Sequence, residues 1–201
     1  FISDECSEDE YRKKLKEELQ NRSILVVGPG KNIELQKNRV DEYILRENPY
    51  VISINYVPSG IKVDAVFATN IKRYHDMKTD GIKVIATTNV ECRNGKFDFV
   101  FNRAPLLERN EKIMDNSFLM LLKLLESIGI NKISCAGFDG YSDKEDNYFN
   151  PEMEYYFVKD EAHNLNVHMR ECIYEARRTM GIKFLTYSAY DMNNDEHDEA
   201  F

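Results

Sequence analysis

The chain has 201 residues, of which 27 are Lys or Arg and 35 are Asp or Glu, and its formal net charge is -8 at pH 7. This length suits one α/β domain with a full core, since two domains would each be small. The acidic balance argues against a nucleic-acid backbone or an anionic membrane surface as the main partner. No apolar run approaches the roughly 20 residues that a membrane-spanning helix needs.

Four cysteines are scattered along the chain, at positions 6, 92, 135 and 172. Their spacing fits neither a metal site nor a redox motif, so we expect reduced structural thiols in a cytoplasmic protein. The first residue is Phe1 rather than methionine, and no signal-type hydrophobic region follows it. We therefore expect this sequence to be a piece of a longer chain.

Helix and strand patterns alternate along the first half of the chain. The sequence Ser-Glu-Asp-Glu at 7–10 has the form of a capping box, and Tyr11, Leu15 and Leu19 then mark one face of a short amphipathic helix. Apolar residues between 33 and 45 carry a second helix, which ends before Pro49. Short β-branched and aromatic runs predict strands at 24–27, 50–54, 64–68, 82–86, 97–101, 132–136 and 183–187.

Two more helices are predicted in the second half. Asp115, Asn116 and Ser117 form a natural N-cap segment, with Ser117 as the cap, for residues 118–128, which are apolar almost all round and therefore belong in the middle of the protein. Residues 167–180 form the last helix, with Gly181 as its stop. We expect a single domain, with an N-terminal helix and linker at 1–22, a core at 23–190 and an acidic tail at 191–201.

The alternation predicts an α/β fold: a three-layer, Rossmann-like, mostly parallel sheet with helices on both faces. Such sheets bind ligands outside the carboxyl ends of their strands. An amide-rich, weakly charged rim at those ends suits hydrogen bonding to a base and a ribose. Single Asn and Ser residues also cap and turn strand ends without a ligand, and this alternative stays open. The rim residues are Gly28, Gly30, Asn55, Thr69, Asn70, Ser117, Asp139 and Tyr141.

The loop Gly28-Pro29-Gly30 follows the first predicted strand directly. Glycines allow an open or left-handed turn, and a helix starting near Asn32 would direct free N–H groups and its positive dipole end at a phosphate. The loop is not a dinucleotide fingerprint, because the third glycine is missing. It is not a Walker A loop either, because Leu25 and Asn32 stand where Gly and Ser or Thr are required. A tight turn without a ligand is an equal alternative.

An ordered series of short motifs resembles the bacterial sialyltransferases that use CMP-sialic acid on lipooligosaccharide. The resemblance implies the same α/β fold and a small-molecule ligand, CMP or a nucleotide sugar, with no metal or other cofactor required. The motifs are Val-Val-Gly-Pro-Gly at 26–30, Ser-Ile-Asn at 53–55, Asp-Ala-Val-Phe-Ala-Thr-Asn at 64–70, Asn-Ser at 116–117, Ala-Gly-Phe-Asp-Gly-Tyr at 136–141 and Ala-His-Asn-Leu-Asn at 162–166.

This resemblance also implies roles for single residues. His163 would be the general base for the acceptor hydroxyl, since an imidazole with a pKa near 6.5 accepts a proton at neutral pH. Tyr141 and Tyr148 would bind the leaving phosphate. A lone histidine before a helix is also often a surface or capping residue, and that interpretation stays open. The residues implied to hold the nucleotide are Gly28, Gly30, Asn55, Asn70, Ser117 and Asp139.

A second resemblance rests on residues 115–125 together with Ala-Gly-Phe-Asp-Gly-Tyr-Ser at 136–142. These look like the C-terminal region of bacterial proteins whose N-terminal part is an aldolase barrel of the hydroxymethylglutaryl-CoA lyase and 4-hydroxy-2-oxovalerate aldolase type. Such proteins are often associated with surface-polysaccharide genes. The resemblance implies that the natural partner of this domain is an N-terminal aldolase barrel of the same protein, in which the lyase chemistry would reside.

Three interpretations follow. The favoured one is a nucleotide- or nucleotide-sugar-binding domain of an aldolase-type protein, because Val27 stands where the sialyltransferases have an asparagine and Ser117 lacks their preceding basic residue. The second is an active, metal-independent, sialyltransferase-like glycosyltransferase with His163 as base. The third is a non-catalytic assembly domain that uses the apolar stripe of the helix at 11–19 as a contact, and whether the chain forms a homo-oligomer stays open.

Overall fold

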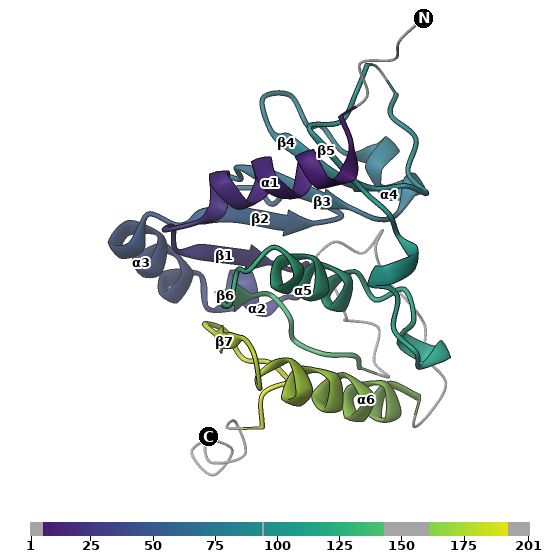
Figure 1. Ribbon diagram of the computed structural model, residues 1–201. Helices are drawn as coiled ribbons and strands as arrows, with labels where there is room; N and C mark the ends of the chain where they lie inside the picture. Colours follow the sequence, from purple (N-terminus) through teal and green to yellow (C-terminus); the bar gives the residue numbers. More distant parts are fainter. Residues whose placement is uncertain (1–5, 94, 143–160, 193–201) are drawn as a thin grey trace, which may run out of the picture.

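A computed structural model describes residues 6–93, 95–142 and 161–192. In these ranges a seven-stranded sheet has the strand order β5-β4-β3-β2-β1-β6-β7 (Figure 1). Every neighbouring pair of strands is parallel, which confirms the expected Rossmann-like α/β fold. The strands are β1 (Ile24–Val27), β2 (Tyr50–Ile54), β3 (Ala65–Ala68), β4 (Lys83–Thr87), β5 (Phe99–Phe101), β6 (Lys132–Ala136) and β7 (Gly181–Phe184).

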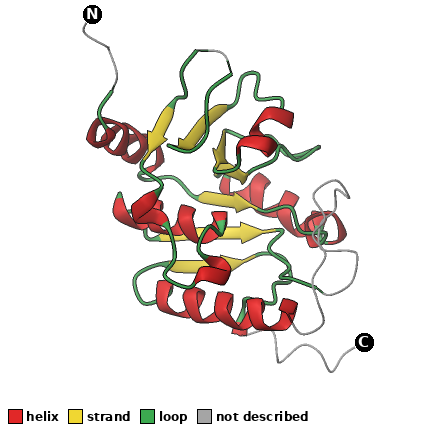
Figure 2. Ribbon diagram, turned by 90° about the vertical axis from the view of Figure 1, so that its right-hand side faces the viewer, coloured by secondary structure: helices red, strands yellow, loops and turns green. Residues whose placement is uncertain are grey.

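Helices cover both faces of the sheet, and the strands lie next to one another between these two helical layers (Figure 2). Along β1, Val26 packs into one buried cluster while Leu25 and Val27 pack into the other. The central strands are apolar on consecutive residues because both of their faces are covered. One face carries α1 (Glu8–Leu19), α5 (Ser117–Ser127) and α6 (Glu161–Ala176), and the other carries α2 (Asn32–Leu35), α3 (Lys37–Glu47) and α4 (Ile71–Asp76).

The direction in which strands are added reverses beside β1. From β1 the chain moves outward through β2, β3 and β4 to β5, and it then returns to place β6 and β7 on the other side of β1. The loops that follow β1 and β6 therefore leave the sheet toward opposite faces. In open α/β sheets such a reversal leaves a crevice at the carboxyl ends of the strands, where ligands bind.

The helix α5 lies in the core, as its composition predicts. The Asn116 side chain caps it by accepting hydrogen bonds from the N–H groups of Phe118 and Leu119, both at 3.1 Å. Seven of its 11 residues are buried, because the sheet lies on one side and α6 and the turn Ala104–Leu106 on others. Polar residues of this helix are confined to Ser117, Lys123 and its exposed last residues, Glu126 and Ser127. The N-cap at Asn116 thus fixes where α5 starts, next to the carboxyl ends of the strands.

The helix predicted over 33–45 is instead two helices, α2 and α3, separated at Gln36. The Gln36 amide oxygen accepts a hydrogen bond from the distant backbone N–H of Tyr187 at 2.9 Å. Leu35 and Leu45 are 78% and 88% exposed, so the apolar spacing that included them was misleading. The break thus lies at a residue with a tertiary contact, which local periodicity does not contain.

The last helix also differs from its prediction. It spans Glu161–Ala176 rather than 167–180, and Gly181 is the first residue of β7 rather than a helix stop. Its buried stripe consists of Ala162, Leu165, Met169 and Ile173. The polar residues between these four masked the first turns in the sequence pattern. The helix α4 was not predicted at all.

The apolar stripe of α1 is buried within the domain. Leu15 and Leu19 are fully buried in the same cluster as Phe99 and Phe101 of β5, and Tyr11 contacts both phenylalanine rings edge to face. The capping box at Ser7 is present as predicted. The suggestion that this stripe serves as an assembly contact is therefore wrong, because the sheet of the same chain covers it.

Within the described ranges, no helix combines the length and the apolar character that crossing a membrane requires. Cys6, Cys92, Cys135 and Cys172 form no disulfide within the described residues, and burial raises the pKa of the Cys135 thiol.

Candidate functional site

A pocket of about 440 Å³ opens at the carboxyl ends of the strands. Its described lining comes from the segments that follow β1, β2, β3, β5 and β6, from the first turn of α5 and from the buried side of α6. Small-molecule sites in proteins usually have volumes of roughly 300 to 1,000 Å³ and favour this place in an α/β sheet. The pocket therefore lies where the topology predicts a ligand.

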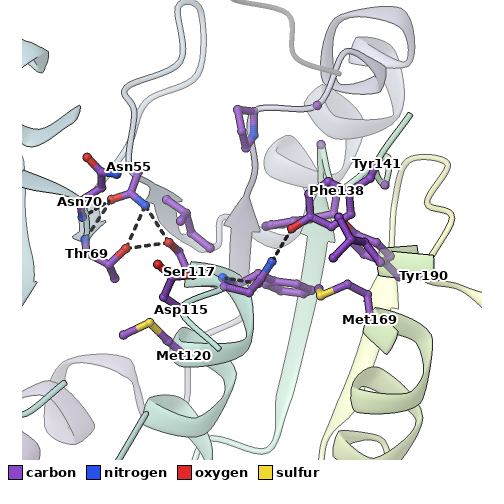
Figure 3. A pocket seen from close by; sticks show the side chains of 18 of the residues that line it. Asn55, Thr69, Asn70, Asp115, Ser117, Met120, Phe138, Tyr141, Met169 and Tyr190 are labelled. Atoms are coloured by element: carbon purple, nitrogen blue, oxygen red, sulfur yellow. Dashed lines mark hydrogen bonds between the residues drawn. The ribbon is translucent and has the colours of Figure 1, made fainter. Parts of the chain in front are cut away.

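One wall of the pocket is a polar cluster of Asn55, Thr69 and Ser117 (Figure 3). The Asn55 amide nitrogen donates to the Thr69 hydroxyl at 3.0 Å and to the Ser117 hydroxyl at 2.8 Å. The Asn55 amide oxygen accepts from the backbone N–H groups of Thr69 at 2.9 Å and Asn70 at 3.3 Å. Asn55 has a φ of 57°, a left-handed conformation that asparagine tolerates well. The ends of β2 and β3 are thereby tied to the start of α5.

Among the described residues, this polar cluster leaves one hydroxyl proton for a further acceptor. The hydrogen-bonding groups of the Asn55 side chain are all used inside the cluster. The Thr69 and Ser117 hydroxyls lie 2.6 Å apart, so one donates to the other and the second keeps its proton. Thr69 is buried and Ser117 is half-buried, so the Ser117 hydroxyl is the more accessible of the two. The cluster thus suits a ligand group that accepts a hydrogen bond.

The opposite wall is aromatic. Phe138, Tyr141 and Tyr190 lie there together with the thioether of Met169 (Figure 3). The Phe138 ring stacks on Phe118 of α5 with centroids 4.0 Å apart, and the Tyr141 and Tyr190 rings are 6.4 Å apart. Flat apolar faces of this kind favour a planar ring in the ligand.

Tyr141 is held in place by two asparagines. The Asn116 side-chain amide donates to the Tyr141 hydroxyl at 3.0 Å. The Asn166 side chain pairs with the backbone of Tyr141, accepting from its N–H and donating to its carbonyl, both at 2.8 Å. The aromatic wall is therefore fixed to both α5 and α6 before any ligand binds.

The glycine loop after β1 is packed against the loop after β6. The N–H groups of Gly28 and Gly30 donate to the carbonyls of Ala136 and Gly137, both at 2.8 Å, and the Tyr56 hydroxyl donates to the Gly28 carbonyl at 2.5 Å. A Cβ on Gly28 would lie 2.5 Å from the Gly137 carbonyl oxygen. Close approach of two loops explains both glycines without a ligand. Gly30 lines the pocket, and Gly28 lies behind it.

Asp139 lies at the start of α2, in the position that a ligand phosphate would take over the glycine loop. Its Oδ2 accepts from the backbone N–H of Asn32 at 2.8 Å, and its Oδ1 is buried against Gly30 without a hydrogen-bond partner among the described residues. Burial raises the pKa of this carboxyl to about 6, although the hydrogen bonds from Asn32 and Lys31 act in the opposite direction. A carboxylate of the protein therefore occupies this place.

Three basic side chains line the pocket, Arg73 of α4, Arg103 after β5 and Lys112 in the turn Glu111–Ile113. The Arg103 guanidinium lies 3.7 Å from Asp115, whose side chain is 76% exposed. The Arg103 Nε is buried and has no hydrogen-bond partner in the described part of the chain. With Asp115 and Asp139 as the acidic lining residues, basic groups are in excess, although the whole chain has a net charge of -8. Such a local excess favours an anionic ligand.

Among the described residues, no group of three or more His, Cys, Asp or Glu is arranged to hold a metal ion. No protein-family model, curated protein or solved structure matches this chain. The geometry of the pocket is therefore what indicates the roles of single residues.

The predicted site residues divide into those that line the pocket, two described residues that do not line it, Gly28 and His163, and Tyr148. Most of them meet in the pocket. His163 lies in the first turn of α6, is exposed, and is not among the described residues that line the pocket. Tyr148 lies outside the described residues. The residues brought together in the lining are Gly30, Asn55, Asn70, Ser117, Asp139 and Tyr141.

Several lining residues were not predicted from the sequence, although they follow the carboxyl ends of strands as the predicted residues do. Arg103 follows β5 closely, and Tyr190 comes after β7, so each stands beyond the end of a strand as Asn55 does. Arg73 comes three residues after Asn70, which is the N-cap of α4, and this spacing places the two on one side of a helix. Attention to basic and aromatic residues at strand ends would have found them.

Proposed function

We propose that this domain binds a nucleotide or nucleotide sugar in the pocket at the carboxyl edge of its sheet. The observation that carries the proposal is the pairing of two unlike walls. A polar cluster with a spare hydroxyl proton faces an aromatic wall, and basic side chains lie in the same lining. A nucleotide has a planar ring, hydrogen-bond acceptors and an anionic group, and this lining offers a counterpart to each.

The pocket favours binding over sialyltransferase-like transfer with His163 as the base. A general base must come within about 3 Å of the proton that it removes, or act through one water. His163 is exposed on α6, whereas Leu165 and Met169 of the same helix line the pocket. A binding domain that accompanies an aldolase barrel of the same protein remains part of the proposal, and its support is the sequence resemblance alone.

The proposal is tested by thermal unfolding of the domain with CMP, CDP, UDP, GDP, ATP and CMP-sialic acid. A ligand at 100 times its dissociation constant adds about 2.7 kcal/mol to the free energy of unfolding. We expect a selective upward shift in Tm with at least one of these compounds. Equal melting curves for all of them would contradict the proposal.

The Ser117 hydroxyl is the best single probe of the site. Replacing it by alanine removes one partner of the polar cluster, and we expect nucleotide affinity to fall about 5- to 20-fold. Ser127, at the other end of α5, is a matched control, because its hydroxyl bonds Leu124 and Arg12 away from the pocket. Ser127→Ala should leave affinity unchanged. Asn55 is a poorer probe, since its loss would also release the ends of two strands.

His163→Ala separates binding from transfer. If His163 is a base, transfer of sialic acid from CMP-sialic acid to a lactose acceptor should fall by about 10² to 10⁴ while nucleotide affinity stays unchanged. Because binding is the proposed role, we expect no transfer above background in the wild type and equal nucleotide affinity in wild type and variant. A large loss of turnover in this variant would favour the transferase interpretation instead.

A further inference from the structure

The usual anion position of this fold is filled by the protein itself. In the loop after β1, the N–H groups of Gly28 and Gly30 bond carbonyls of the β6 loop, and that of Asn32 bonds Asp139. A phosphate placed there would have to displace the Asp139 carboxylate or lie beside it. The anionic end of a nucleotide is therefore expected elsewhere in the pocket.

The β3–β5 side of the pocket offers two arginines instead. Arg73 lies on α4 after β3, one turn beyond Asn70, and Arg103 follows β5, where its backbone N–H bonds Thr88 at 3.2 Å. Both side chains are half-buried, which weakens the screening of their charges by water. Arg73 and Arg103 follow β3 and β5, which lie on the same side of the reversal beside β1, away from the aromatic wall.

Arg103 is incompletely bonded as it stands. Its Nε is buried without a hydrogen-bond partner in the described ranges, and its nearest carboxylate, Asp115, is 3.7 Å away and mostly exposed. An unmade hydrogen bond to a buried charged group is unfavourable. Because a guanidinium presents donors in a planar fork, a phosphate can accept from Nε and a terminal nitrogen together. A ligand phosphate would thus supply the missing acceptor.

We propose that Arg73 and Arg103 form the phosphate subsite of this pocket, so that the nucleotide lies with its phosphate on the β3–β5 side and its base toward Phe138, Tyr141 and Tyr190. This inference rests on the proposed function and adds an orientation to it. The orientation is opposite to the one that a phosphate over the glycine loop would impose.

The test compares dissociation constants of cytidine, CMP and CDP, and of uridine, UMP and UDP, by calorimetry. The wild type should bind the phosphorylated forms about tenfold or more tightly than the nucleosides. Arg73→Gln and Arg103→Gln should each bring this ratio close to one and leave nucleoside affinity unchanged. Arg103→Lys, which keeps the charge but loses the fork, should give an intermediate ratio and guards against a folding defect in Arg103→Gln.

Lys31 is the matched control, because it is a basic residue next to the glycine loop. Lys31→Gln should keep the wild-type ratio. A ratio that falls in Lys31→Gln and stays high in the arginine variants would overturn the subsite while leaving nucleotide binding intact. Failure of the wild type to bind any of the six compounds would overturn the proposed function, and the subsite with it.

Discussion

Asp139 and Gly30 meet although they belong to loops far apart in the sequence. The hydrogen bond from Asn32 to Asp139 spans 107 residues, and the Asp139 Oδ1 lies so close to Gly30 that a Cβ there would collide with it. The loops after β1 and β6 are therefore packed into one unit beside the pocket. A side chain on Gly28 or Gly30 would force these two loops apart.

Gly28→Ala tests this packing of the two loops. The added Cβ would lie 2.5 Å from the Gly137 carbonyl and 2.7 Å from the Phe138 ring, so we expect a loss of about 1 to 3 kcal/mol in the free energy of unfolding. Gly181→Ala is the control, because its nearest neighbour is 3.6 Å away, and its stability should change by less than about 0.5 kcal/mol. Equal urea midpoints for the two variants would contradict the packing argument.

Asp139 should make stability depend on pH. Burial raises its pKa from 3.8 to about 6 in the folded protein, so between these values the folded state holds a proton that the unfolded chain has released. Stability therefore falls as pH rises from about 4 to 7, by about 3 kcal/mol once the carboxyl is fully ionised in both states. In Asp139→Asn this component should be absent. Urea unfolding at pH 4, 5, 6 and 7 measures it, and parallel curves for the two proteins would contradict the assignment.

At the scale of elements, the start of α5 joins stability to the site. Asn116 caps the helix and also donates to Tyr141. Asn116→Ala should lower the free energy of unfolding by about 1 kcal/mol, as loss of an N-cap does, and Asn116→Ser should recover most of it. Asn110 is the matched control, because it caps only the three-residue turn Glu111–Ile113 and accepts a single hydrogen bond there, from the Lys112 N–H, so its alanine variant should cost clearly less. Thermal melting of the three variants distinguishes these outcomes.

The elements that sequence predicts well are those whose signals are local. The strands β1, β2 and β6 have the predicted bounds because burial on both faces requires consecutive apolar residues. The cap Ser7 acts within a single turn and was predicted from the sequence, whereas α5 is capped by Asn116 and not by the expected Ser117, which is the first residue of the helix. The break at Gln36, whose side chain bonds the distant Tyr187, and the start of α6 at Glu161 lie at positions that the apolar periodicity does not mark.

The candidate site shows the same difference between features that local sequence predicts and features that it does not. Asn55, Asn70 and Ser117 were expected at strand and helix ends, and topology alone brings them to one edge. The direction of the Asp139 carboxylate could not be predicted, because it depends on how closely two loops approach. The distance of His163 from the lining could not be predicted either, since it follows from which face of α6 is buried.

At the scale of the whole molecule, stability and binding are carried by different regions. Leu15 of α1 is fully buried against the sheet and lies outside the pocket lining. Leu15→Ala should lower the free energy of unfolding by about 2 to 5 kcal/mol without changing the nucleotide affinity of the folded protein. Leu45→Ala is the control, because Leu45 is 88% exposed, and its unfolding should be nearly unchanged. Urea unfolding and calorimetry on the same samples measure both quantities.

The packing of α1 has a consequence for how the chain acquires its structure. The Arg12 guanidinium of α1 bonds the Ser127 hydroxyl at 2.5 Å across 115 residues of sequence, and the phenylalanines that cover its apolar side lie in β5. At ordinary rates of translation, α1 leaves the ribosome on the order of ten seconds before its last contact is synthesised. During that time its leucines are exposed to water and to other nascent chains. This helix thus gains its full set of contacts only after five of the seven described strands, β1 to β5, have been synthesised. The yield of the protein in a cell should therefore depend on chaperones that shield the α1 leucines during that interval.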